Sequence, residues 1–391
     1  MLSLSPTRYV GRISYSLYLW HWPLLVFAGL LWGALSPWAG FLVVLASVLP
    51  AIACYELVER RFRSSRLWSA RPRQSYLLGG GCTAVAAFAG IGVLALTPTT
   101  HTAALEHVTG HPKLHQGHGI QHTAHAVRPN PADAGDDRGK MYADGCLVPK
   151  PKDRSPKCVY GDTSSSTTVV LFGDSHAMQW FPALDRVAKQ RGWRLVGLTK
   201  SGCPASDVTV YLPHLHGPYD VCDTWRARAL DRIKEISPAI VVIGGFATYQ
   251  TDDDGQPQSA DASHQRLVRG YVDTLEELKG TGARVVLMRD TPHPGDVRQC
   301  VANHLQHLTS CAATNDKAFG YVPILPKVAR QFSGATLLDS SSELCRDDTC
   351  PAVIGNALVY RNGDHLTATF ARTMAPWLND HLPRLASAPS T

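Results

Sequence analysis

The chain has 391 residues, of which 45% are hydrophobic and 18% charged, so it is long enough for one large domain and a smaller region. Its formal net charge of +6 arises within residues 1–75, which hold eight arginines and only two acids, Glu56 and Glu59. The remainder holds 30 basic and 30 acidic residues, so nothing in the charge indicates a surface for nucleic acid.

Three apolar stretches in residues 1–97, namely 13–35, 41–57 and 76–96, have the length of about 20 residues that a membrane-spanning helix needs. A cleaved signal peptide is the alternative for the first stretch. Tyr18, Trp20 and Trp22 and the lack of a small-residue cleavage site favour a retained helix. We therefore predict three transmembrane helices.

The arginines predict how these helices cross the cell membrane. Arg8 and Arg12 precede the first stretch, and six more arginines lie between the second and the third. Positively charged segments stay in the cytoplasm, so an odd number of crossings places everything after Pro98 outside it. We expect a multi-pass membrane protein with an extracytoplasmic C-terminal domain.

The cysteines agree with this topology. Eight of the ten follow the third stretch, an even number that an oxidising compartment favours. Eight cysteines allow 105 pairings, and we expect the four sequential ones: Cys146 with Cys158, Cys203 with Cys222, Cys300 with Cys311, and Cys345 with Cys350. Their scattered spacing does not indicate a metal site, and we expect neither a metal nor a cofactor.

Residues 98–140 are rich in histidine, glycine and proline and have no hydrophobic period, which is typical of a linker. Seven histidines fall between His101 and His125. Metal binding is an alternative for them, but their spacing is irregular, and we interpret the segment as solvated.

From residue 141 to 391 apolar runs alternate with helical patterns. The runs 167–172, 194–198, 239–243 and 284–288 predict strands, and 178–191, 224–236 and 264–279 predict helices. Strands that are apolar on both faces indicate a parallel sheet covered on two sides, so the fold class is α/β with three α/β/α layers. Ligand chemistry is then expected at the carboxyl ends of the strands.

Two short motifs carry the candidate chemistry. Gly173-Asp174-Ser175-His176 follows the first strand and opens a helix, so Ser175 lies on a sharp turn where helical N–H groups face a developing oxyanion. The alternative is an ordinary helix cap. Near the other end, His365 precedes the helical pattern 368–378 and is a candidate base for the serine, unless it only starts that helix.

The segment from residue 159 to 381 resembles the SGNH hydrolase domains that are fused to acyltransferase-3 membrane proteins. The resemblance rests on GDSHA at 173–177 and YRNGDHLTATFA at 360–371, and it implies that Ser175 is the nucleophile and His365 the base. The family has an aspartate three residues before that histidine, where this chain has Asn362. Asp364 is a possible substitute, but adjacent side chains on an extended loop usually diverge.

The resemblance also implies an oxyanion hole. It points to the N–H groups of Ser175 and of Gly202 after the second strand. The family's asparagine after the third strand is missing, and Gly244-Gly245 stands there, which equally suits a sharp turn. Asp174 and Gly245 complete the candidate oxyanion or substrate-binding residues.

Residues 8–23 and 56–63 resemble the last helices of acyltransferase-3 proteins. The resemblance implies an acyl-ester hydrolase or O-acyltransferase acting on cell-envelope glycans or lipids, with transfer requiring a partner that carries the other helices. The alternative is a non-catalytic glycan-binding or scaffolding remnant, which Asn362 favours. A start encoded further upstream also remains open.

Overall fold

The computed structural model describes residues 5–32, 35–61, 72–96, 108–110, 123–124 and 126–385. They belong to two compact units, Met1–Pro98 and Thr99–Thr391. All seven histidines of the expected linker lie outside the described residues.

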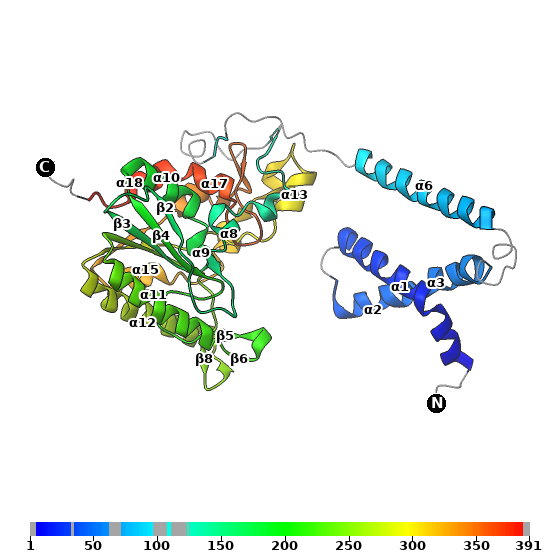
Figure 1. Ribbon diagram of the computed structural model, residues 1–391, viewed down its shortest axis with the longest axis horizontal. Helices are drawn as coiled ribbons and strands as arrows, with labels where there is room; N and C mark the ends of the chain where they lie inside the picture. The colour runs from blue at the N-terminus through cyan, green and yellow to red at the C-terminus, as the bar shows by residue number, and fades with distance from the viewer. Residues whose placement is uncertain are drawn as a thin grey trace. The chain divides into compact units, whose positions relative to one another are not determined.

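The first unit is helical (Figure 1). Its elements are α1 (Ser5–Trp32), α2 (Pro37–Ala46), α3 (Val48–Cys54), the π-helical turn η1 (Tyr55–Glu59) and α6 (Pro72–Leu96). Ser16 Oγ of α1 donates a hydrogen bond of 3.1 Å to Glu59, and Tyr9 Oη lies 3.4 Å from Glu56. Both acids of this unit are therefore engaged by α1.

The prediction of three membrane spans is supported at one place. Among the described residues, the continuous helical segment Pro37–Glu59 is the one long and apolar enough to cross a membrane. The apolar part of α6, Tyr76–Gly92, is shorter. In α1 the hydropathy is lowered by arginine, histidine and serine side chains, and residues 33–34 of the expected first span lie outside the described residues.

The second unit is built on a seven-stranded sheet in the order β1-β4-β3-β7-β10-β12, with β2 antiparallel to β4 on the outer edge that β1 also uses. All other pairs are parallel, which confirms the predicted α/β class. The strands are β1 (Leu147–Val148), β2 (Val159–Gly161), β3 (Thr168–Gly173), β4 (Arg194–Lys200), β7 (Ile240–Gly244), β10 (Arg284–Met288) and β12 (Ala335–Leu338).

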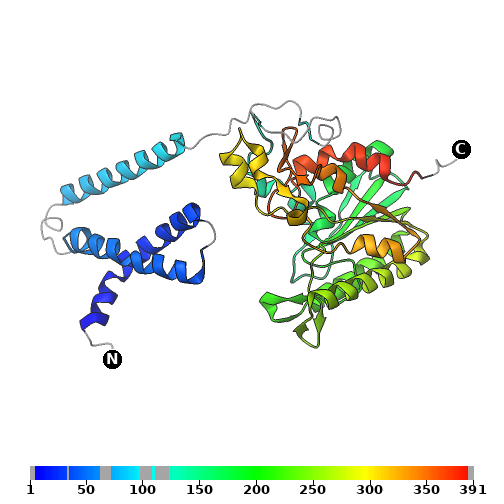
Figure 2. The same cartoon turned by 180° about the vertical axis from the view of Figure 1, so that it is seen from behind.

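Helices cover both faces of the sheet, as the opposite views in Figures 1 and 2 show. One face carries α9 (Ser175–Met178), α10 (Phe181–Arg191), α17 (Ala368–Thr373) and α18 (Ala375–His381), and the other carries α11 (Asp220–Ile236), α12 (Ala260–Leu278) and α15 (Leu325–Gln331). Successive strand residues point to opposite faces: Val169 and Leu171 join the first core, Val170 and Phe172 the second. The expected helix 368–378 is divided at Met374, because Pro376 requires a new first turn.

Short elements complete the unit around the sheet. The two-stranded pairs are β5 (Tyr211–Leu212) with β6 (Gly217–Pro218), β8 (Asp252–Asp253) with β9 (Gln256–Pro257), β11 (Ala313–Thr314) with β13 (Thr349–Cys350), and β14 (Val353–Ile354) with β15 (Ala357–Leu358). The short helices are α8 (Lys140–Ala143), α13 (Arg298–Asn303), α14 (Asn315–Ala318) and α16 (Ser341–Leu344), and the 3₁₀ turns are η2 (Ala134–Asp136), η3 (Pro213–Leu215), η4 (Lys279–Thr281) and η5 (Leu308–Cys311).

The folded unit includes residues that we expected in the linker. Val127 and Ala134 are buried in the core beneath α10 and α17. Asp137 accepts the backbone N–H of Thr369 at 2.8 Å, and its carbonyl accepts that of Ala368. The C-terminal part of the segment 98–140 is therefore part of the domain.

The four sequential disulfides are present as predicted: Cys146–Cys158, Cys203–Cys222, Cys300–Cys311 and Cys345–Cys350. Cys146–Cys158 joins the segments that lead into β1 and β2, the two strands that share one edge of β4. Cys203–Cys222 joins the loop after β4 to the start of α11. Each bridge thus closes a short loop beside a sheet element or a helix.

Candidate active site

Ser175 is the first residue of α9, two residues after the end of β3. The Asp174 carboxylate caps this helix by accepting the N–H groups of His176 at 2.7 Å and Ala177 at 3.4 Å. Gly173 has a φ of 143°, and a Cβ there would overlap the carbonyl oxygen of Gly244. The glycine therefore allows the sharp turn that presents the serine at the sheet edge.

The second motif reaches the same edge from 190 residues further along the chain. His365 Nε2 lies 2.9 Å from Ser175 Oγ, within hydrogen-bond distance. The loop that carries His365 is closed by a backbone bond of 2.9 Å from Arg361 N–H to the His365 carbonyl, and the next helix, α17, is capped by Thr367. The structure thus brings together the two residues that we expected to act as nucleophile and base.

The carboxylate beside His365 comes from Asp364. Its Oδ1 lies 2.5 Å from His365 Nδ1, a short distance typical of a charge-assisted hydrogen bond. A proton on Nδ1 directed at this carboxylate leaves Nε2 as the acceptor for the serine proton. Asp364 therefore provides the carboxylate partner of His365, which the family resemblance had placed at position 362.

Asn362 instead shapes the turn. Its Oδ1 accepts the backbone N–H of His365 at 2.8 Å and that of Asp364 at 3.3 Å, and its Nδ2 lies 3.2 Å from His365 Nδ1. We expected the side chains of Asp364 and His365 to diverge as on an extended loop. They converge because these bonds to Asn362 fold the segment into a tight turn.

The expected oxyanion donors follow adjacent strands. Gly173 of β3 is level with Thr199 of β4, so Ser175 and Gly202 follow neighbouring strand ends at the same edge of the sheet. Gly202 has a φ of 65°, which favours glycine. Within residues 126–385 neither the N–H of Ser175 nor that of Gly202 donates to another protein group. Both donors are therefore available for an oxyanion.

Asp174 and Gly245 lie in the framework of the turn. Besides its own helix, Asp174 accepts the N–H of Phe246 at 2.8 Å and the hydroxyl of Tyr249 at 2.7 Å, and its side chain is fully buried. A Cβ on Gly245 would overlap Tyr271 Oη. Asp174 therefore joins the Ser175 turn to the loop after β7, and Gly245 lets that loop approach Tyr271 closely.

A second histidine lies next to His365 and has its own carboxylate, and the sequence did not lead us to either. The ring of His176 has its centroid 4.3 Å from that of His365, and its Nδ1 lies 2.7 Å from Asp290 Oδ1. Asp290 follows β10 by two residues. Its place after a parallel strand was the available indication, because the carboxyl ends of such strands meet at one edge.

The ionisation states fit a base at position 365. Burial lowers the pKa of His365 to about 4 and outweighs the neighbouring Asp364 carboxylate, which raises it. Burial raises the pKa of Asp364, but its hydrogen bond with His365 outweighs this and brings the pKa to about 2. At neutral pH the pair is therefore a carboxylate beside an uncharged imidazole.

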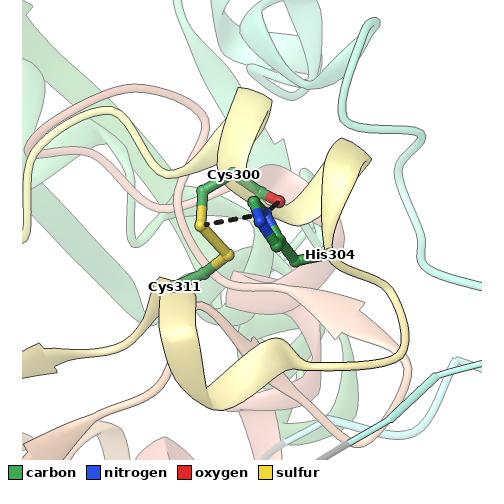
Figure 3. A group of neighbouring side chains, drawn as sticks. All are labelled: Cys300, His304 and Cys311. Atoms are coloured by element: carbon green, nitrogen blue, oxygen red, sulfur yellow. Dashed lines mark hydrogen bonds between the residues drawn. A yellow bond between two sulfur atoms is a disulfide. The ribbon is translucent and has the colours of Figure 1, made fainter.

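Three sets of described side chains have the composition of metal ligands. In the set of His176, Asp290 and His293, the carboxylate bonds both rings. In the set of His176, Asp364 and His365, the carboxylate bonds His365, and His176 bonds Asp290 instead. The third set is Cys300, His304 and Cys311, drawn in Figure 3, where the two sulfurs form a disulfide and His304 Nδ1 bonds the Cys300 carbonyl at 2.9 Å. A disulfide offers no thiolate, so this set binds no metal in the oxidised state.

Comparisons with known proteins match the part of the chain that carries this site to a family. The family model described as the SGNH domain fused to AT3 domains matches residues 145–380. A search of curated proteins found no match.

Among solved structures, the periplasmic domain of a lipopolysaccharide acetyltransferase from Salmonella ser. Paratyphi A is 14% identical; the match covers 73% of this chain and 97% of that one, with a TM-score of 0.40. A GDSL-like lipase from Bacteroides thetaiotaomicron is also 14% identical; the match covers 55% of this chain and 87% of that one, with a TM-score of 0.32.

The family match includes Ser175, Gly202 and His365 and spans more than half of the chain. It does not include residues 1–97, so their resemblance to acyltransferase-3 helices stays a prediction. The chain therefore belongs to the family of SGNH domains that are fused to AT3 domains.

Proposed function

We propose that this protein is a membrane-anchored acyl-ester hydrolase or O-acyltransferase that acts on glycans or lipids of the cell envelope. The observation that carries the proposal is the chain of contacts from Ser175 Oγ to His365 Nε2, 2.9 Å, and from His365 Nδ1 to Asp364, 2.5 Å. A hydroxyl, an imidazole and a carboxylate in this order are the parts that an acyl-transfer site requires.

The reaction follows from these contacts. Ser175 Oγ attacks the ester carbonyl carbon while its proton passes to His365 Nε2, and the carbonyl oxygen becomes an oxyanion beside the N–H groups of Ser175 and Gly202. Asp364 stabilises the imidazolium. The bond to the alcohol then breaks, the alcohol leaves with the proton from His365, and the acyl group stays on the serine. Water completes a hydrolysis, whereas an acceptor hydroxyl completes a transfer.

The place of action is part of the proposal. Four disulfides suit an oxidising compartment, and the segment Pro37–Glu59 is long enough to anchor the chain. Together with the arginine distribution, they favour a multi-pass protein with its C-terminal domain outside the cytoplasm. For acyl transfer, a partner with further acyltransferase-3 helices would supply the donor through the membrane.

The test uses the full-length chain purified in detergent. We expect a fluorophosphonate probe to label the protein on Ser175, and we expect hydrolysis of a small acetyl ester such as 4-nitrophenyl acetate. Ser175→Ala should abolish both, while Ser164→Ala, the same change on an exposed turn, should leave both unchanged. A wild-type protein that is folded, unlabelled and inactive would exclude the enzyme and leave the alternative of a glycan-binding SGNH remnant.

A further inference from the structure

His176 follows the nucleophile directly, yet the proposed reaction does not use it. Its side chain is 3% exposed, and its ring lies against that of His365 at a centroid distance of 4.3 Å. Phe246 packs on it from the loop after β7, with ring centroids 4.9 Å apart. His176 thus fills the space between the base and the neighbouring strand ends.

Asp290 fixes the orientation of this second imidazole. Its carboxylate accepts four hydrogen bonds: from His176 Nδ1 at 2.7 Å, Thr291 N–H at 2.8 Å, Ala247 N–H at 3.0 Å and His293 Nε2 at 3.1 Å. A buried carboxylate with this many donors stays ionised. The Nδ1 of His176 must therefore carry a proton.

Three carboxylates and two further histidines surround His176. The groups that face His176 are Asp174 on its own turn, Asp290 and His293 after β10, and Asp364 and His365 on the loop before α17. Three carboxylates near one imidazole favour its protonated form. Burial lowers the pKa of His176, but Asp290 outweighs it and raises the pKa to about 9.

We propose that His176, held by Asp290, is a positioning residue that stays protonated and keeps the adjacent His365 uncharged. The proposal deepens the acyl-transfer function and rests on His365 being its base. Two imidazoles in contact in a buried site do not readily both carry a charge, so the proton on His176 leaves His365 free to accept the Ser175 proton. Asp364 then stabilises the charge that His365 gains only during the reaction.

The distribution of carboxylates decides which imidazole keeps the proton at rest. The Asp290 carboxylate and its partner His176 have side chains that are 4% and 3% exposed, whereas Asp364 is 33% exposed. A charge pair that is shielded from water is the stronger one at a similar distance. The resting proton therefore belongs on His176, and the catalytic proton passes through His365.

The main test is the pH dependence of fluorophosphonate labelling of the full-length chain. Removing the charge in His176→Gln should move the acid limb of the labelling rate to higher pH by about one to two units, the size expected for a unit charge at this distance. Asp290→Asn should move it in the same direction. His304→Gln is the matched control: it makes the same change in an exposed side chain that bonds the Cys300 carbonyl, and the limb should stay in place.

Histidine NMR of the wild-type chain tests the same point without catalytic turnover. It also does not depend on whether the His176 and Asp290 variants fold. The imidazole signal of His176 should have the chemical shift of a protonated ring at pH 7, whereas that of His365 should be neutral. An unshifted acid limb in both His176→Gln and Asp290→Asn, or a neutral His176 at pH 7, would overturn the proposal. A wild-type chain that no probe labels at any pH would end the acyl-transfer function, and the NMR result would still decide the charge of His176.

Discussion

Replacing Asp364 with asparagine removes the charge that faces His365 Nδ1 at 2.5 Å and keeps the shape of the side chain. In the transition state this carboxylate stabilises an imidazolium, and two unit charges about 4 Å apart at an effective dielectric constant near 20 attract by about 4 kcal/mol. At 1.36 kcal/mol for each factor of ten, the upper expectation is a fall in kcat of about 10³. The Asp364 side chain is 33% exposed, which weakens the attraction, so we expect a fall of about 10²–10³ with little change in KM.

The assay is hydrolysis of 4-nitrophenyl acetate by the full-length chain at neutral pH. Asp347→Asn is the control, because it makes the same change in a side chain that is 85% exposed. Adding Asn362→Asp to Asp364→Asn should restore at least about tenfold, since position 362 reaches to 3.2 Å from His365 Nδ1. A single variant that keeps more than about a fifth of kcat, or a double variant no better than the single one, would refute the assignment of Asp364.

Three further outcomes concern stability. Gly245→Ala should lower the free energy of unfolding by about 1–3 kcal/mol in urea, and adding Tyr271→Phe should recover part of it, because the hydroxyl is what the new methyl group meets. Replacing Cys203 and Cys222 with alanine should cost about 2–4 kcal/mol in the same assay. The pKa of His176 is raised to about 9, so the stabilisation that its protonation gives the folded state is complete below the ordinary pKa of ~6.5 and is lost as the pH rises through 9. The urea midpoint should therefore fall over that pH interval, and it should fall less in His176→Gln.

The central sheet could be predicted from the sequence because its inner strands are buried on both faces. The strands β3, β7 and β10 coincide with continuous apolar runs and begin or end within a residue of the predicted positions. The edge strand β12 was missed, since Ala335–Leu338 is shorter than the predicted apolar runs and only its last residue is buried. The first expected span is not among the described helices that are apolar enough to cross a membrane, because polar side chains on α1 interrupt its apolar face.

The candidate site could be predicted as far as it depends on local motifs. Ser175 and His365 each stand at the junction of an element and a turn, and such junctions are visible in a sequence. Asp290 and His176 meet only because β3 and β10 flank β7 in the sheet, and strand order is not written in any local pattern. The requirement for glycine at position 245 is equally invisible in the local sequence, because the side chain that leaves no room for a Cβ there is Tyr271 on α12.

The turn before His365 explains how this chain keeps a carboxylate at its base without the family's aspartate. An oxygen at position 362 that accepts the N–H groups of residues 364 and 365 bends the backbone, and the bend places the side chain of Asp364 beside the imidazole. An amide suits position 362 in this arrangement, because its oxygen holds the turn and its uncharged Nδ2 adds no second negative charge near Asp364. Asn362 and Asp364 therefore form one unit: the amide supplies the bend, and the bend makes the neighbouring carboxylate the partner of the base.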